Sequence, residues 1–400
     1  MSIYTALADT IQIMDPLDFH PTAPGQVIRA SAGYWAFLPD PLPPPFSWSA
    51  ALVSLLAEAE RTLAQLAEVG TRFTNPHVMV RSFVRQEAVL SSRIEGTRTS
   101  LEELYTFEAV QLSFLPSVLD AREVYNYVQA LDYGLQRLDS LPVSLRLIRE
   151  LHAKLMEGVR GDHLTPGQFR RSQNWIGSPG STLETATFIP PPVVQMLTAL
   201  DQLEKFIHAP SDLPPLARLG MIHYQFEAIH PFLDGNGRVG RLLIALLLCE
   251  WGLLPLPLLY LSAYFEANRQ AYYHHLLVVS QAGDWKGWLQ FFLTGVRDQA
   301  RIATQRVRKL QALQARYWEQ LQAERDRDRL MKVVDFLIGH PIVTIRQVQI
   351  GIGARDYKIA QRYIRKLTQA GILSEVTGQA RNRVYRAGEI LDAIERPLKE

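Results

Sequence analysis

Apolar residues along much of this chain recur at spacings of three and four, the period of an amphipathic helix. The first such stretch begins near Ser49, with apolar positions at Leu52, Leu55, Leu56, Ala59, Leu63 and Leu66. A second helix is predicted over residues 77–95 and should end at Gly96, because glycine favours helix C-termini. Further helices are predicted over residues 121–138, 144–157, 193–207, 216–229 and 237–251, the last of which should be buried. The pattern predicts a mostly α-helical fold.

The helical pattern breaks over residues 171–192. Gly177, Pro179 and Gly180 mark a turn there, since glycine and proline are frequent turn residues. Residues 186–189 are compatible with a short strand, and the three prolines that follow would end it. We predict a small β-hairpin on an otherwise helical body.

The two ends of the chain differ from this body. Residues 1–45 are rich in proline and aromatic residues, which predicts an extended arm lying on the body. Residues 301–328 form a charged, helix-favouring connector, and the three helical stretches and two strand-like stretches after it resemble a winged helix-turn-helix domain. We therefore expect four parts, over residues 1–110, 111–300, 301–328 and 329–400.

The composition is that of an ordinary folded protein, with 47% hydrophobic and 20% charged residues. The single cysteine, Cys249, excludes a disulfide within the chain and a cysteine-based zinc cluster. The start of the chain lacks the pattern of a secretory signal, and its most apolar run is shorter than the roughly 20 residues of a membrane span. We expect a cytoplasmic protein with no membrane association.

The residues from His230 to Arg241 combine several groups that suit phosphate chemistry. They form a loop that leads into a helix, and free N–H groups at a helix N-terminus bind anions. Arg238 and Arg241 are three residues apart and share one face of that helix. Asp234 offers an oxygen ligand for Mg²⁺, and His230 is a side chain able to act as a base near neutral pH. The segment predicts a phosphoryl- or nucleotidyl-transfer site.

This segment resembles the Fic signature, His-x-Phe-x-(Asp/Glu)-Gly-Asn-Gly-Arg-x-x-Arg, and matches every specified position. The resemblance implies a protein adenylyltransferase that transfers AMP from ATP to a Ser, Thr or Tyr hydroxyl of a target protein. His230 would deprotonate this hydroxyl and Asp234 would hold Mg²⁺. The implied nucleotide-binding residues are Gly235, Asn236, Gly237, Arg238, Arg241, Asn268 and Tyr272.

Two of these residues lie in a later segment, residues 262–273, which resembles the nucleoside-binding part of the family. Asn268 would bind adenine and Tyr272 would line the base pocket. From the residues alone, aromatic side chains at this helical spacing would more simply be core residues. The hairpin predicted over residues 171–192 occupies the place of the family's flap, on which the target protein docks as an added strand.

Residues 91–96 match the family's inhibitory pattern, (Ser/Thr)-x-x-x-Glu-(Gly/Asn), through Ser91, Glu95 and Gly96. The Glu95 carboxylate would pair with Arg241 and occupy the space of the γ-phosphate, so that bound ATP is misaligned for attack. Without the neighbouring signature, Glu95 would be read as a surface charge. In some relatives the same glutamate orients a water molecule that removes AMP, which would make this enzyme bifunctional or mainly a de-AMPylating one.

The C-terminal part is basic, with 13 Lys and Arg against 7 Asp and Glu from Arg329 onward, whereas the remainder has 29 against 33. Its cations recur along one predicted helix and on the presumed wing, at Lys358, Arg362, Arg365, Lys366, Arg381, Arg383 and Arg386. This pattern suits duplex DNA, and a protein-docking or homodimer-positioning module is the alternative.

Two classes of function therefore remain open. The first is an adenylyltransferase restrained by Glu95, whose activity would be visible as self-AMPylation. The second is a DNA-binding regulator that uses the Fic core as a nucleotide sensor. The intact His230 favours the enzyme, because sensing needs the phosphate cradle but not the base.

Overall fold

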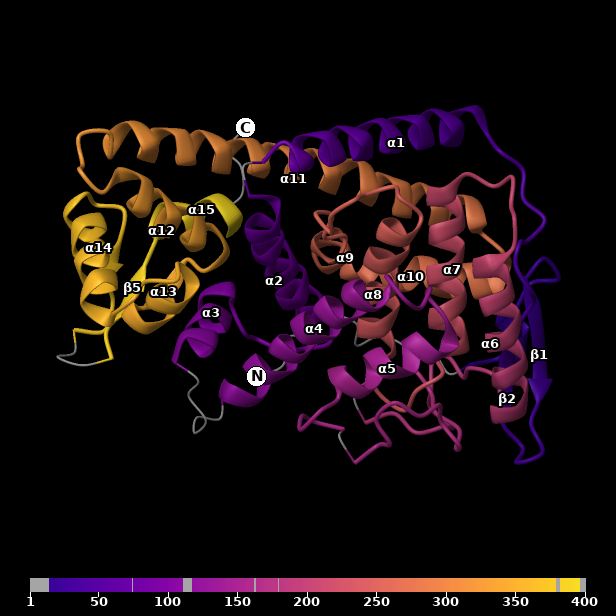
Figure 1. Ribbon diagram of the computed structural model, residues 1–400. Helices are drawn as coiled ribbons and strands as arrows, with labels where there is room; N and C mark the ends of the chain where they lie inside the picture. The colour runs from indigo at the N-terminus through magenta and orange to yellow at the C-terminus, as the bar shows by residue number, and fades with distance from the viewer. Residues whose placement is uncertain are drawn as a thin grey trace.

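The computed structural model describes residues 14–73, 75–110, 117–161, 163–178, 180–378 and 382–395. Most of them are helical, as predicted, and the buried helix α8 (Asn236–Glu250) lies within the main body (Figure 1). Twelve of its 15 residues are buried. It packs against α4 (Ser117–Arg137), α5 (Leu145–Leu155) and α7 (Pro215–Ile229). The other helices of this body are α2 (Pro76–Ile94), α3 (Leu101–Val110), α6 (Val193–His208), α9 (Ser262–Ala267) and α10 (Arg269–Ala282).

One long helix, α11 (Trp285–Gln320), runs along the molecule, and α1 (Ala50–Thr71) lies beside it (Figure 1). Arg297 and Arg301 of α11 each lie 3.6 Å from the Glu58 carboxylate of α1. The helix continues without a break past residue 300, so the segment expected to be a connector begins as an extension of a helix of the body.

The N-terminal arm is a hairpin, where the sequence predicted an extended segment. Its strands are β1 (Gly25–Arg29) and β2 (Trp35–Pro39), which pair antiparallel. The Phe37 amide donates to the Ile189 carbonyl over 2.9 Å, so the hairpin does lie on the body, beside the predicted flap. Residues 1–13 of the predicted arm lie outside the described residues.

The hairpin predicted over residues 171–192 is present in a minimal form. Ile176 and Phe188 form a single antiparallel bridge, with amide-to-carbonyl distances of 2.8 and 3.0 Å. Three successive prolines, which lack an N–H donor, begin two residues beyond Phe188 and prevent a longer ladder. Pro179 of the predicted turn lies outside the described residues.

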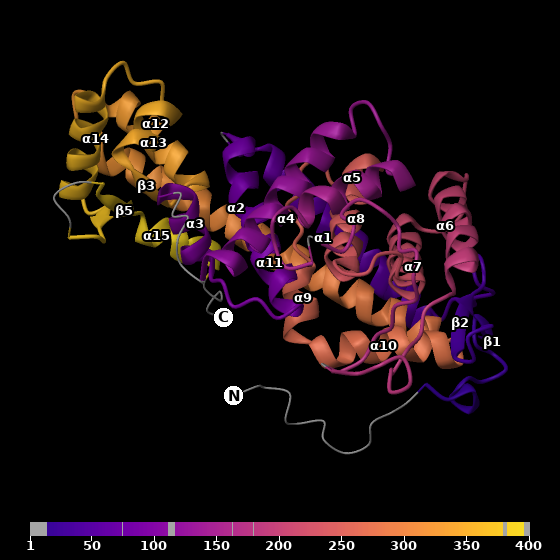
Figure 2. The ribbon, with the colours of Figure 1, turned by 90° about the horizontal axis from the view of Figure 1, so that it is seen from below.

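The described residues of the C-terminal part form four helices and a small sheet, at one end of the molecule in both views (Figures 1 and 2). The sheet has the order β3-β5-β4 and is antiparallel. The predicted assignment to the winged helix-turn-helix class stays a prediction. In chain order the elements are α12 (Arg327–Gly339), β3 (Ile342–Thr344), α13 (Ile345–Gly351), α14 (Tyr357–Gln369), β4 (Ser374–Glu375), β5 (Val384–Arg386) and α15 (Gly388–Glu395).

This C-terminal part packs against α2 and α3 of the N-terminal part. The Ser82 hydroxyl of α2 donates to the Ile338 carbonyl of α12. Arg386 of β5 lies 3.3 Å from the Glu102 carboxylate of α3. A Cβ added to Gly339 would come within 2.8 Å of the Val78 carbonyl, so the two parts approach closely at backbone level. No helix in the part of the chain that the structure describes is long and apolar enough to cross a membrane.

Candidate active site

The signature loop begins at His230, where α7 ends in a left-handed residue with φ of 50°. The following proline disfavours helical geometry at His230, which explains why the helix stops there. Positive φ is uncommon for a residue with a side chain, and here two donors hold the His230 carbonyl. Arg170 Nε lies 3.0 Å and Asn174 Nδ2 lies 3.1 Å from this oxygen. The loop is therefore fixed at its entrance by Asn174 of the predicted flap and by Arg170 just before it.

The His230 imidazole is held in one tautomer. Its Nδ1 lies 3.2 Å from the Glu227 carbonyl, which can only accept, so Nδ1 carries the proton and Nε2 keeps its lone pair. Burial, assisted by the nearby Arg170 guanidinium, lowers the pKa of His230 to about 4. At neutral pH the side chain is thus a neutral imidazole with Nε2 available to accept a proton.

A second histidine, His152 of α5, packs against the loop and holds it through hydrogen bonds. Its ring stacks on Phe232 with centroids 3.8 Å apart and an interplanar angle of 5°. Its Nδ1 accepts from the Gly167 amide over 2.8 Å, and its Nε2 donates to the Asp234 carbonyl over 3.0 Å. The sequence analysis missed this residue. The available signal was its position on the apolar face of α5, next to Leu151.

Asn236 closes the loop on itself. Its Oδ1 accepts from the Phe232 amide and its Nδ2 donates to the Phe232 carbonyl, both over 2.8 Å. The side chain was expected to hold phosphate, but both of its polar atoms are used within the loop and the residue is 2% exposed. A phosphate contact by this side chain stays a prediction.

The first turn of α8 is where the sequence predicted an anion site, and that site stays a prediction. Gly235, with φ of 79°, precedes the helix, and no side chain caps the N–H groups of its first turn. Arg238 is 3% exposed and lies 3.3 Å from Glu123 of α4 and 3.6 Å from Asp234. Glu123 is a partner that the sequence analysis did not find. It comes from a separate helix, far from the signature in the chain.

Asp234 lies at the open side of the loop, with its side chain 45% exposed. Its Oδ1 accepts from the Gly235 amide over 2.6 Å, which leaves the second oxygen for a ligand. Among the described residues, no three His, Cys, Asp or Glu side chains are grouped as a metal site. A Mg²⁺ ion held by Asp234 would therefore take its other ligands from phosphate and water, the usual arrangement for this ion.

Arg241 is enclosed by the end of α2. Its Nε donates to the Ser91 hydroxyl over 2.8 Å, and its Nη2 donates to the Ser91 carbonyl over 3.0 Å and to Glu95 over 2.6 Å. Burial opposes the charge of Glu95, but the Arg241 guanidinium outweighs it and lowers the pKa of this carboxyl. A Cβ added to Gly237 would collide with the Glu95 carboxylate. The carboxylate thus lies directly over the first turn of α8.

Gly96 lets the chain leave α2 just after Glu95. Its φ is 102°, a conformation that residues with a side chain rarely adopt. The preceding residue, Glu95, is the C-cap of α2, and this places its side chain at the end of the helix that faces α8. The three inhibitory residues predicted from the sequence are therefore brought together with Arg241.

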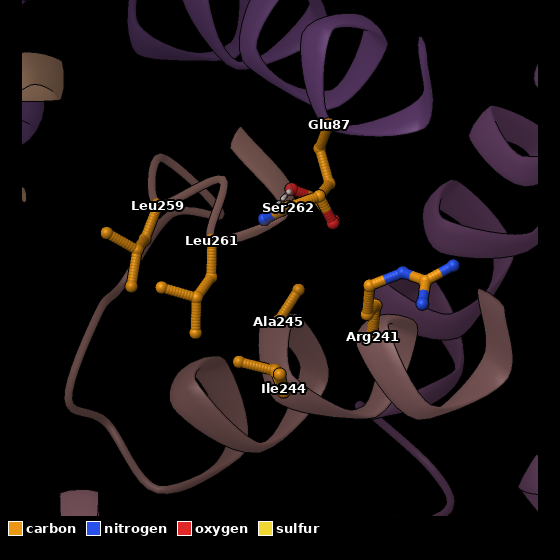
Figure 3. A pocket seen from close by; sticks show the side chains of 7 residues that line it. All are labelled: Glu87, Arg241, Ile244, Ala245, Leu259, Leu261 and Ser262. Carbon is orange, nitrogen blue, oxygen red and sulfur yellow. Dashed lines mark hydrogen bonds between the residues drawn. The ribbon is translucent and has the colours of Figure 1, made fainter. Parts of the chain in front are cut away.

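A small cavity lies between Glu87 of α2, the α8 residues from Arg241 to Ala245, and residues 259–262 (Figure 3). Glu87 of α2 reaches into this region, where it accepts from the Ser262 hydroxyl and amide and from the Tyr127 hydroxyl. Burial raises the pKa of Glu87. The cavity holds about 10 Å³, which is at most the size of one water molecule. It is too small for a nucleotide, and its polar contacts fix α2 against α9.

Residues 262–273 were expected to contact the nucleoside, and this expectation stays a prediction. Tyr272 is 1% exposed, its ring stacks on Phe265 at 4.4 Å, and its hydroxyl lies 2.8 Å from His223 Nε2. The alternative interpretation as a core residue therefore describes it. Tyr273, by contrast, is 42% exposed. Asn268 is also exposed, with its Nδ2 donating to the Tyr264 carbonyl over 2.9 Å.

Two parts of the chain match models of known protein families. Residues 142–248 match the model of the Fic/DOC family, and residues 53–136 match the model of the Fic/DOC family N-terminal region. The chain therefore contains a Fic/DOC domain preceded by the N-terminal part of that family.

Among curated proteins, the chain is similar to the protein adenylyltransferase Fic of Drosophila erecta, with 25% identity over 205 residues, and to that of Drosophila virilis, with 26%. Each match covers 50% of this chain but only 37% and 38% of the relative. The matched region thus spans well under half the length of these relatives.

Two solved structures share the fold. A Fic family protein from Desulfovibrio desulfuricans G20 superposes with a TM-score of 0.55 at 20% identity, covering 86% of this chain and 98% of that one. Fic-1 (residues 134–508) from C. elegans superposes with a TM-score of 0.50 at 20% identity, covering 66% and 74%. The helical Fic fold predicted from the sequence is confirmed.

Proposed function

We propose that this protein transfers AMP from ATP to the hydroxyl of a Ser, Thr or Tyr side chain. The observation that carries the proposal is the neutral His230, with a free Nε2, beside a helix N-terminus that has two arginines. In the reaction, His230 Nε2 takes the proton of the hydroxyl, whose oxygen attacks the α-phosphorus. The bond from this phosphorus to the bridging oxygen breaks, and pyrophosphate leaves with the electron pair. The two Drosophila relatives are named protein adenylyltransferases, which supports the proposal.

The cradle for the phosphates consists of the N–H groups at the start of α8, with Arg238 and Arg241 at their side. Gly235 and Gly237 have no Cβ, so the phosphates approach the backbone closely. Asp234 would hold Mg²⁺, which neutralises phosphate charge when bound. Arg238 would bind the β-phosphate and Arg241 the γ-phosphate.

Glu95 restrains this activity in the same chain. Its carboxylate already lies over the first turn of α8 and pairs with Arg241 at 2.6 Å, so it competes with the γ-phosphate for both. ATP would then bind with its α-phosphate out of line with the hydroxyl. Misplacement by about 1 Å can lower a rate by 100-fold.

A second activity of the same site is removal of AMP from a modified target. Glu95 supports this candidate because its side chain is 34% exposed and its lowered pKa keeps it ionised. An ionised carboxylate at this position can orient an attacking water molecule.

The target would dock on the flap over residues 171–192, whose side chains Trp175 and Ile176 are 41% and 36% exposed. An extended target segment beside this flap would gain main-chain hydrogen bonds as an added strand. Exposed hydroxyls of the protein itself, or of a second copy in a homodimer, are the first acceptors to examine.

The function is tested by incubating the Glu95→Gly protein with Mg²⁺ and each of the four nucleoside triphosphates, followed by intact-mass measurement. We expect a mass increase of one AMP with ATP, and no increase for Glu95→Gly combined with His230→Ala. Transfer from another nucleotide would correct the substrate, and transfer without His230 would contradict the mechanism.

A further inference from the structure

The helix α14 has one buried and one open side. Its apolar residues face α12 and α13, and they are buried: Ala360, Tyr363, Ile364 and Leu367. The opposite side is exposed and basic. We call the exposed cations Lys358, Arg362 and Arg365 of this side, together with Arg355 just before the helix, the basic face. Lys358, Arg362 and Arg365 are spaced by four and three residues, so they lie along one line of the helix.

Most cations of the basic face lack a counterion. In the part of the chain that the structure describes, no carboxylate forms an ion pair with Arg355, Lys358 or Arg365. Arg362 lies 3.6 Å from Asp326. Lys366, by contrast, pairs at 2.7 Å with Glu324, in the turn between α11 and α12. The uncompensated charge is therefore concentrated on the solvent side of α14.

The shape of this region suits a nucleic-acid duplex. With 13 residues, α14 is about 20 Å long, and the major groove of DNA is about 12 Å wide and admits a helix. The helix lies near the outer end of the molecule in both views, away from the Fic core (Figures 1 and 2). Gln361 is exposed between the cations, and an amide side chain in this place can reach a base edge.

We propose that the basic face of α14 binds duplex DNA, with the cations on phosphates and the helix in the major groove. The deep, narrow major groove of RNA does not admit a helix, which excludes duplex RNA as the fitting ligand. The core of a protein-docking surface is usually apolar and depleted in charge. Tyr357, 46% exposed, is the only large hydrophobic side chain that the fully described α14 exposes. The face therefore suits a polyanion better than a protein.

The wing contributes less than the sequence suggested. Arg383 lies 3.4 Å from Glu375, and Arg386 lies 3.3 Å from Glu102 of α3. Both cations are therefore at least partly compensated within the protein, and Arg386 faces the N-terminal part. Arg381, the third predicted wing cation, lies outside the described residues. The helix, more than the wing, is the contact surface.

Fluorescence anisotropy of a labelled 20-base-pair duplex with the full-length protein tests this proposal. Four phosphate contacts predict a slope of log affinity on log salt of about −3.6, or about a 100-fold loss between 50 and 200 mM salt. Arg355→Gln, Lys358→Gln and Arg365→Gln together should reduce the slope to about −1.

A matched control removes three exposed cations elsewhere, through Arg61→Gln, Arg308→Gln and Lys309→Gln. It should bind the duplex within about twofold of the wild type, because phosphate contacts act locally. Melting curves that coincide with the wild type show that both triple variants are folded. Three results would overturn the proposal: no binding at 50 mM salt, equal loss in both triple variants, or equal affinity for polyglutamate or duplex RNA at matched charge. Because AMP transfer does not enter this experiment, its outcome is independent of the proposed function.

Discussion

The arginines of the active site and the cations of α14 carry the same charge in opposite surroundings. Arg238 and Arg241 are 3% and 2% exposed, and each is paired with a carboxylate from another helix. Arg355, Lys358 and Arg365 are exposed and have no such partner among the described residues. A buried cation needs a counterion, whereas water is sufficient at the surface. The cations of the core are therefore already engaged, and those of α14 are available.

The two pairs in the core also differ from each other. Glu123 beside Arg238 has a side chain that is 4% exposed, whereas Glu95 beside Arg241 is 34% exposed at a helix end. A carboxylate enclosed on all sides is a permanent part of the structure. One at an open edge can be displaced by a ligand of the same charge. The difference indicates that Arg241, and not Arg238, has the replaceable counterion.

The largest effect should follow loss of the base. In the Glu95→Gly background, His230→Ala should lower the rate of AMP transfer by about 100- to 10,000-fold, the usual contribution of a positioned base. ATP affinity should change little, because Nε2 faces the hydroxyl and not the nucleotide. The measurement is AMP incorporation beside ATP binding by calorimetry, with Arg308→Gln as a control. Activity above a few per cent would remove His230 from this role.

The next effect tests whether the buried pair of Arg238 and Glu123 stabilises the fold. Glu123→Gln leaves the buried Arg238 guanidinium with only the more distant and more exposed Asp234 carboxylate, and should lower the free energy of unfolding by about 3 kcal/mol. Glu68→Gln is the control, because the Glu68–Arg72 pair is 57% and 74% exposed and such pairs contribute less than about 1 kcal/mol. Urea unfolding measures both. Equal losses would show that burial does not distinguish the pairs.

The smallest effect concerns pH. Because burial lowers the pKa of His230 from 6.5 to about 4, the imidazole is already neutral at pH 6 and gains its proton only as the pH falls through about 4. AMP transfer by the Glu95→Gly protein should therefore stay constant from pH 8 to 6 and decline below about pH 5. Glu95 raises the pKa of His230, so removal of Glu95 should lower this pKa further. Half-loss of activity near pH 6.5 would indicate an ordinary, solvated histidine.

Much of this structure could be predicted because it is local in the chain. The helices follow from apolar spacing, and the end of α7 at His230 follows from the proline after it. The signature brings His230, Asp234 and the two arginines together because twelve successive residues form one loop and the first turns of the helix after it. The Glu95 to Arg241 distance of 2.6 Å agrees with the expectation that the two side chains pair.

What could not be predicted depends on contacts between distant segments. Glu123 and His152 contact the loop from α4 and α5. The position of His152 on the apolar face of α5 indicates that it is buried, but its contact with the loop depends on how distant segments pack. Tyr272 has the same residue type as Tyr273 beside it, and the packing of α10 against α7, α9 and α11 decides which one is buried. The contact between the C-terminal part and α2 also joins segments that are far apart in the chain, so the sequence pattern did not predict it.

The central claim is that Glu95 occupies the place of the γ-phosphate on Arg241. The most direct test compares initial rates of self-AMPylation for the wild type, Glu95→Gly, Arg241→Ala and the double variant, by intact mass with ATP and Mg²⁺. We predict that Glu95→Gly is faster than the wild type by up to about 100-fold, and that Arg241→Ala is no faster. The double variant should resemble Arg241→Ala, because both groups share one ligand contact and their effects are not additive. A Glu95→Gly protein no faster than the wild type, or a double variant as fast as Glu95→Gly, would contradict the claim.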